Sequence, residues 1–136
     1  MTQNKLDISG ATEAVKATRF VEALSLLESN LAKDPNHIDS LYLAAVCSRY
    51  LKNYDDAKKY IESLLSQAPD MGRAYQELGH LNRDIGNQEN SITHYRQACE
   101  LNPALMSSWK ALYDYFRSNK NKPAADHAFM QMNTLQ

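Results

Sequence analysis

Residues 41–103 read LYLAAVCSRYLKNYDDAKKYIESLLSQAPDMGRAYQELGHLNRDIGNQENSITHYRQACELNP. In this stretch Ala57 is followed four residues later by Ile61, and one period further on Ser91 is followed in the same way by Tyr95. The period is marked by three evenly spaced prolines, which are Pro35, Pro69 and Pro103. A fixed period of about 34 residues in a helix-rich chain predicts stacked two-helix units.

The composition is that of a folded and nearly neutral protein. The 136 residues carry a net charge of −1, with 43% hydrophobic and 23% charged residues. This charge balance argues against nucleic acid or an anionic membrane surface as a partner. No stretch has the apolar length of a signal peptide or of a bilayer span, so we expect a cytoplasmic protein that binds no membrane. Cys47 and Cys99 lie far apart in helical patterns, which predicts two buried, reduced thiols.

Alignment on the period divides the chain into units at 4–37, 38–71, 72–105 and 106–136. One column of these units is always small, and its members are Ala23, Ala57, Ser91 and Ala125. The column four residues later is always bulky, and its members are Leu27, Ile61, Tyr95 and Phe129. A small residue lets two helix backbones approach closely, and the bulky residue fills the space beyond the contact.

Each unit is predicted to contain two helices. Apolar residues spaced i, i+3, i+4 and i+7 indicate first helices near 6–17, 37–51, 71–85 and 105–118. Second helices are predicted near 20–33, 54–67, 88–101 and 122–134. Between the two helices of the third unit, Gly86 is well placed to adopt the left-handed conformation that ends a helix. Asp7 is the exception in an early column that is otherwise large and apolar.

These columns resemble the tetratricopeptide repeat. Tyr75-x2-Leu78-Gly79 and Trp109-x2-Leu112 match the first half of that family's pattern, and Ala57-x3-Ile61 and Ala125-x3-Phe129 match the second half. The resemblance covers essentially the whole chain. It implies an all-α fold, a right-handed α-solenoid of about four stacked helix-turn-helix units that form a single domain over residues 1–136. It also implies a curved inner wall that is built from the first helices.

The inner wall is expected to expose positions two, five, nine and twelve of each unit. The wall positions from Arg49 to Arg117 are mainly basic. The candidate peptide-binding residues on this wall are Tyr42, Arg49, Arg73, Gln76, His80, Arg83, Lys110 and Arg117. Asp39 and Asp114 are the carboxylates among the same positions of the second to fourth units. An excess of cations favours an acidic or mixed peptide or loop, held by charge-assisted hydrogen bonds. The alternative interpretation is a set of solvated polar positions without a ligand.

One peptide-binding mode of this family can be tested on the sequence. Members that bind chaperone tails clamp a terminal carboxylate with Lys, Asn and Arg side chains from three units. The matching positions here are Ile8, Thr12, Leu43, Arg73 and Glu77. Only Arg73 fits this pattern, since Ile8 and Leu43 have no side-chain donor and Glu77 would repel a carboxylate. We therefore expect no binding of EEVD-type chaperone tails.

The sequence contains no recognisable catalytic or cofactor motif. The histidines are not spaced as in HExxH, the two cysteines do not form a CxxC pair, and the phosphate loop GxxxxGK[ST] and the GxGxxG and GxSxG motifs are absent. We therefore expect no enzyme activity, no cofactor and no metal site. A stand-alone enzyme would need a convergent polar pocket, which the sequence does not reveal.

The last predicted helix is expected to expose an apolar flank. Ala125, Ala128, Phe129 and Met132 would face a partner protein, a second copy in a homodimer or a continuation of the polypeptide, of which we favour continuation. Residues 102–112 are similar to arrays that precede sulfotransferase domains in bacterial proteins. The main hypothesis is a non-catalytic protein–protein interaction scaffold. The alternative is an accessory N-terminal domain of a larger enzyme, which positions substrate or mediates dimerisation.

Overall fold

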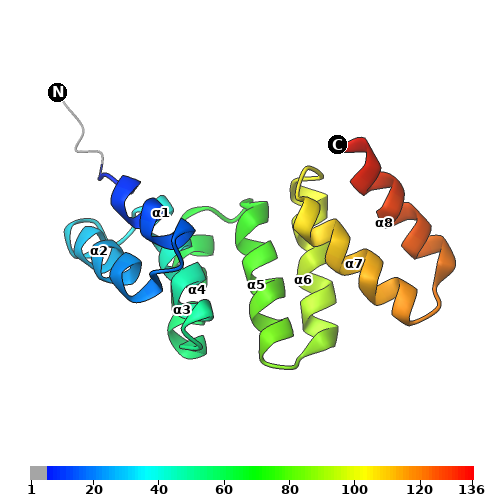
Figure 1. Cartoon of the computed structure of the whole chain (residues 1–136), viewed down its shortest axis with the longest axis horizontal. Helices are drawn as coiled ribbons and strands as arrows, with labels where there is room; N and C mark the ends of the chain where they lie inside the picture. The colour runs from blue at the N-terminus through cyan, green and yellow to red at the C-terminus, as the bar shows by residue number, and fades with distance from the viewer. Residues whose placement is uncertain (1–5) are drawn as a thin grey trace. The chain divides into compact units, whose positions relative to one another are not determined.

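The computed structural model describes residues 6–136, and within them it contains eight α-helices and no strand (Figure 1). The helices are α1 (Ser9–Lys16), α2 (Phe20–Lys33), α3 (Ile38–Tyr50), α4 (Tyr54–Gln67), α5 (Gly72–Asp84), α6 (Gln88–Leu101), α7 (Met106–Ser118) and α8 (Lys122–Thr134). The predicted second helices agree with α2, α4, α6 and α8 at both ends. The all-α prediction is therefore confirmed for this part of the chain.

The start of the first helix was predicted too early. α1 begins at Ser9 rather than near residue 6. Just before it, the backbone N–H of Ser9 donates to Asp7 Oδ1 over 2.8 Å. Hydrogen bonds with Ser9 also lower the pKa of the Asp7 carboxyl. A short acidic side chain that binds the backbone two residues on favours a turn over a helix, which explains why Asp7 interrupts the apolar column.

The chain divides into two compact units, Met1–Pro69 and Asp70–Gln136. In the first unit α1, α2, α3 and α4 contact one another in chain order, and α1 also contacts α3. In the second unit α5, α6, α7 and α8 do the same, and α5 also contacts α7. Each unit therefore consists of two stacked helical hairpins whose first helices touch. A single domain over residues 1–136 stays a prediction.

The small column of the repeat is buried at all four positions, Ala23, Ala57, Ser91 and Ala125. The bulky column is buried at Leu27, Ile61 and Tyr95, but the side chain of Phe129 is 46% exposed. Phe129 lies on α8, and its ring meets that of Tyr113 on α7 with the centroids 5.8 Å apart. No helix of residues 6–136 other than α7 contacts α8, so Phe129 does not fill a core contact and lies partly exposed, as expected for the apolar flank of the last helix.

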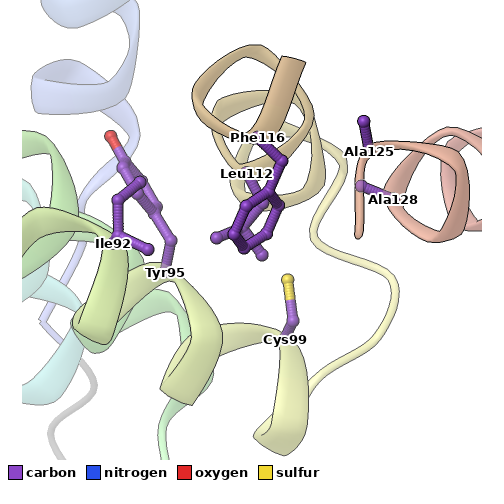
Figure 2. Close-up of a cluster of buried hydrophobic side chains, with 7 residues drawn as sticks. All are labelled: Ile92, Tyr95, Cys99, Leu112, Phe116, Ala125 and Ala128. Atoms are coloured by element: carbon purple, nitrogen blue, oxygen red, sulfur yellow. The ribbon is translucent and has the colours of Figure 1, made fainter. Parts of the chain in front are cut away.

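Two alanines of α8 also behave differently from the expectation. Ala125 and Ala128 are buried, and they belong to a cluster with side chains of α6 and α7 rather than facing a partner (Figure 2). The other members of the cluster are Ile92, Tyr95, Cys99, Leu112 and Phe116. This cluster is the apolar core of the second unit. The first unit has its own cluster, which contains the buried thiol of Cys47. Neither Cys47 nor Cys99 forms a disulfide, and both are buried, as predicted.

The hairpin turns share one backbone conformation that recurs with the repeat. Positive φ angles are found at Thr18 (59°), Lys52 (64°), Gly86 (88°) and Lys120 (57°). After each of them, the next N–H donates to a carbonyl five residues earlier, for example from Asn53 to Ser48 over 2.8 Å. This is the Schellman pattern that satisfies the last carbonyls of a helix. The prediction for Gly86 is confirmed, whereas the other three turns use non-glycine residues.

Candidate functional site

The predicted inner wall can be followed in the second unit, where α5 and α7 touch. The hydroxyl of the buried Ser108 on α7 donates to Gln76 Oε1 on α5 over 2.7 Å. Gln76 is half-buried as a result of this packing. Its side chain therefore joins two neighbouring helices of the wall, a role that the sequence did not reveal.

Four predicted site residues of this unit carry exposed cations. They are Arg73 and Arg83 on α5, and Lys110 and Arg117 on α7. Lys110 Nζ lies 3.0 Å from Asp114 Oδ2, and Arg83 Nη2 lies 3.1 Å from Asp84 Oδ1. Ion pairs at such exposed positions contribute little to stability and exchange readily with other partners. The wall thus offers more positive than negative groups to a ligand.

A polar network joins α5 to α6 behind these cations. His80 Nδ1 lies 2.6 Å from the hydroxyl oxygen of the buried Tyr95. Arg83 Nη1 donates to the same hydroxyl oxygen over 3.3 Å, and its distance from His80 Nδ1 is also 3.3 Å. His80 is half-buried, and its ring meets that of Tyr95 edge-on. The network therefore holds Arg83 and His80 in place on the wall.

A cavity of about 230 Å³ lies beside this network. Arg83 comes from α5, Ser91 and Tyr95 come from α6, and Asp114 and Tyr115 come from α7. Arg83 and Asp114 were expected at wall positions, but the cavity between them was not predicted. The small side chain of Ser91 was its only signal, because a small residue beside two large rings leaves room.

The two predicted site residues of the first unit lie on α3. Tyr42 is half-buried, but Arg49 is only 6% exposed, so the expectation of an exposed Arg49 is wrong. The guanidinium carbon of Arg49 lies 4.5 Å from the ring centroid of Tyr50. A planar cation stacks readily on an aromatic face, so this contact covers one side of the guanidinium.

Residues 6–136 contain no group of three or more His, Cys, Asp or Glu side chains placed to hold a metal ion. In the same residues no helix combines the length and the apolar character that crossing a bilayer requires.

Comparison with known families decides the identity of the fold. A family model of the tetratricopeptide repeat matches residues 14–80, and a second one matches residues 72–105. This chain belongs to the tetratricopeptide repeat family. Together the two matches span all of α2 to α6, and the repeats of this family serve as protein–protein interaction scaffolds.

Solved structures with the same fold support this assignment. The tetratricopeptide chain is similar to MamA 41-end from Desulfovibrio magneticus RS-1, with 20% identity over 94% of this chain and 72% of that chain, and a TM-score of 0.76. A crystal structure of MamA shares 19% identity over 97% and 76% of the two chains, with a TM-score of 0.74. No curated protein sequence matches the chain. At these identities the likeness shows the fold alone, a solenoid of helix-turn-helix repeats.

A third solved structure is also similar to this chain, but the match covers a smaller share of that structure than of the two MamA structures. It is the C-terminal part of a TPR repeat-containing protein from Cytophaga hutchinsonii, with 22% identity and a TM-score of 0.70. The match covers 93% of this chain but 50% of that one. The fold of this chain therefore corresponds to half of that longer chain.

Proposed function

We propose that this tetratricopeptide chain is a non-catalytic scaffold that binds an acidic or mixed peptide segment along α5 and α7. The observation that carries the proposal is the exposure of Arg73, Arg83, Lys110 and Arg117 on two helices that touch. Two of these cations form exposed ion pairs, Arg83 with Asp84 and Lys110 with Asp114. Among the predicted wall positions of α5 and α7, four are cations and Asp114 is the one carboxylate.

The other predicted groove residues have different roles in this proposal. Gln76 and His80 are held by Ser108 and Tyr95, so they contribute a fixed polar surface rather than mobile charges. The cavity beside Arg83 offers room for one ligand side chain. Arg49 is buried and is left out of the proposed contact surface, whereas Tyr42 remains a candidate for an apolar contact.

The proposal excludes chaperone tails of the EEVD type. Of the family's clamp positions, Glu77 is a buried acid on α5, and Leu43 on α3 has no side-chain donor. A terminal carboxylate would therefore lack the convergent donors that this mode requires. Recognition is expected to depend on acidic side chains distributed along the peptide instead.

The test is a charge reversal of the wall. A fluorescein-labelled Glu-rich peptide and a Gln-rich peptide of equal length are titrated with the full chain, and binding is followed by fluorescence anisotropy. We expect saturable binding of the Glu-rich peptide that weakens as salt is raised, because salt screens exposed charges. The double variant Arg73→Glu with Arg83→Glu should abolish this binding.

A matched control makes the same change in charge away from the wall. Lys58 and Lys59 are exposed on α4, and Lys58→Glu with Lys59→Glu should leave the affinity unchanged. Circular dichroism and thermal unfolding check that both double variants are folded, since Arg83 also contacts Tyr95. Equal affinity of the wild-type and Arg73→Glu, Arg83→Glu proteins for the Glu-rich peptide would refute the proposed surface.

A further inference from the structure

The fourth hairpin turn differs in charge from the others. The corner between the two helices of a repeat contains the left-handed residue, and these residues are Thr18, Lys52, Gly86 and Lys120. At the fourth corner Lys120 stands between two further cations, Arg117 at the end of α7 and Lys122 at the start of α8. Three cations thus gather within six residues of the chain, from two helices and the turn that joins them.

These cations line a cavity of about 330 Å³ between α7 and α8. Asn121 and Tyr113 contribute polar groups to its wall, and Asp126 contributes the one carboxylate among its lining residues. The guanidinium carbon of Arg117 lies 5.9 Å from the ring centroid of Tyr113, near the outer limit of a cation–π contact. Arg117, Lys120 and Lys122 are all exposed, so a ligand can reach them.

The charges of this cavity do not cancel. Lys122 Nζ lies 2.8 Å from Asp126 Oδ2, and this exposed pair accounts for one cation and the carboxylate. Arg117 and Lys120 then leave two positive charges among the lining residues. A hollow with excess positive charge and hydrogen-bond donors favours an anionic group with several acceptor oxygens.

The α3–α4 turn, which is the second hairpin turn of the first unit, shows that the fold alone does not produce an excess of positive charge. There Lys52 occupies the same left-handed position as Lys120, at φ 64° compared with 57°. A cavity of about 370 Å³ also lies at that corner, but its lining includes Asp55 and Asp56 besides Lys52. The charged residues of that lining carry a net negative charge. The same backbone therefore presents opposite charges at the two corners.

We propose that the cavity formed by Arg117, Lys120 and Lys122 is an anion-binding subsite that takes a carboxylate or phosphate group of a peptide ligand. The inference rests on the proposed peptide-binding function and adds a location and a ligand chemistry to it. Arg117 belongs both to the predicted inner wall on α7 and to this cavity. A peptide that follows α5 and α7 would thus end or bend with an anionic group at the α7–α8 turn.

The test uses short probes and the ¹⁵N-labelled full chain. The probes are acetyl-Gly-Ser-Gly-Glu-amide for a side-chain carboxylate, acetyl-Gly-Ser-Gly-Gly with a free C-terminus, and acetyl-Gly-phosphoserine-Gly-amide. Acetyl-Gly-Ser-Gly-Gln-amide is the uncharged comparison. We expect at least one anionic probe to shift the amide signals of residues 117–126 in a saturable manner, and the uncharged probe to shift none. The anionic probe with the strongest shifts identifies the source of the ligand group.

Two variants decide whether the cations cause the shifts. Arg117→Gln with Lys120→Asn should lose them, and asparagine at position 120 retains a residue that tolerates the left-handed conformation. The control Lys52→Asn makes the matching change at the acidic corner and should leave the shifts intact. Saturable shifts that persist in Arg117→Gln, Lys120→Asn would overturn the subsite, as would an absence of shifts with all three anionic probes.

The subsite and the peptide-binding wall fail separately in these experiments. If Arg73→Glu with Arg83→Glu leaves Glu-rich peptide binding intact while the short anionic probes still shift residues 117–126, the wall is refuted and the subsite is supported. If the short probes fail while the Glu-rich peptide still depends on Arg73 and Arg83, the subsite is refuted and the wall is supported.

Discussion

The backbone of Gly79 lies directly against the ring of Tyr95. A Cβ atom added at Gly79 would stand 2.7 Å from Tyr95 Cδ1 and Cε1 and 3.0 Å from Cγ. The ring cannot move aside easily, because Tyr95 is buried and its hydroxyl is bonded to His80 and Arg83. This contact joins α5 to α6 immediately behind the candidate wall.

We expect Gly79→Ala to lower the free energy of unfolding by about 1–2 kcal/mol. Overpacking costs roughly 1–3 kcal/mol, and the removal of a helical glycine returns up to about 1 kcal/mol. Gly10→Ala is the control, since its added Cβ would meet Leu26 Cδ1 at an ordinary 3.5 Å and should stabilise the helix. Urea unfolding measures both variants, and a stabilised Gly79→Ala protein would contradict the close approach.

The left-handed turn residues predict opposite changes in the free energy of unfolding for two substitutions. Thr18→Gly should raise the free energy of unfolding by about 0.5–1 kcal/mol. The left-handed region costs a non-glycine residue roughly 1–2 kcal/mol, and glycine removes this cost. Glycine also makes the unfolded chain more flexible, which offsets part of the stabilisation. Gly86→Ala should lower the free energy of unfolding by about 1 kcal/mol for the same reason. Thermal unfolding of both variants checks the pair, and equal signs would contradict the shared turn conformation.

Ser48 is the basis of a third prediction. Its buried hydroxyl oxygen has no hydrogen-bond partner among the described residues. A buried polar group without a partner costs about 1–3 kcal/mol, so Ser48→Ala should stabilise the protein or leave its stability unchanged. Ser108→Ala is the matched change at an equally buried serine that donates to Gln76, and it should cost about 1 kcal/mol. Denaturant unfolding of the two variants should therefore separate them.

The buried thiol of Cys99 predicts a loss of stability at alkaline pH. Burial, with a smaller contribution from the charge of Glu100, raises the pKa of Cys99 to about 12 from an ordinary value of 9.0. Above about pH 9 the unfolded chain loses this proton while the folded chain keeps it, so the stability falls by up to about 1.4 kcal/mol per pH unit until the folded pKa is reached. Below about pH 9 the thiol of Cys99 is protonated in both the folded and the unfolded chain, so it does not make the stability depend on pH.

The measurement is urea unfolding of wild type and Cys99→Ala from about pH 8 to about pH 11. The difference in stability between the two proteins isolates the thiol from other groups, such as Tyr60, whose pKa is also raised by burial. We expect this difference to be constant below pH 9 and to shrink above it. A difference that does not vary with pH would show that Cys99 is accessible to solvent in the folded protein.

Much of the fold was predictable from spacing alone. The prolines and the small column at Ala23, Ala57, Ser91 and Ala125 determine the register of the helices, because both features depend on local geometry that recurs in every repeat. The failures lie where a neighbour outside the local pattern decides the outcome. Phe129 repeats the bulky column, but within residues 6–136 only α7 contacts its helix, so it is exposed as expected for the last helix and not buried as its column predicts.

The candidate site was only partly predictable for a related reason. The repeat columns describe one helix at a time, so they predict wall positions such as Arg83 and Arg117 but no contact that crosses between helices. The bond from Ser108 to Gln76 and the stacking of Arg49 on Tyr50 depend on side-chain directions that no residue type reveals. The cationic corner was missed because its members come from two helices and a turn.

The most direct test of the central claim is to locate a bound acidic peptide on the protein. A Glu-rich peptide that carries a photoreactive benzophenone is crosslinked to the full chain, and mass spectrometry identifies the attached residues. The account predicts crosslinks on α5 and α7, close to Arg73, Arg83 and Lys110, that disappear with excess unlabelled Glu-rich peptide. Crosslinks confined to the exposed faces of α6 and α8, or unaffected by the competitor, would contradict it.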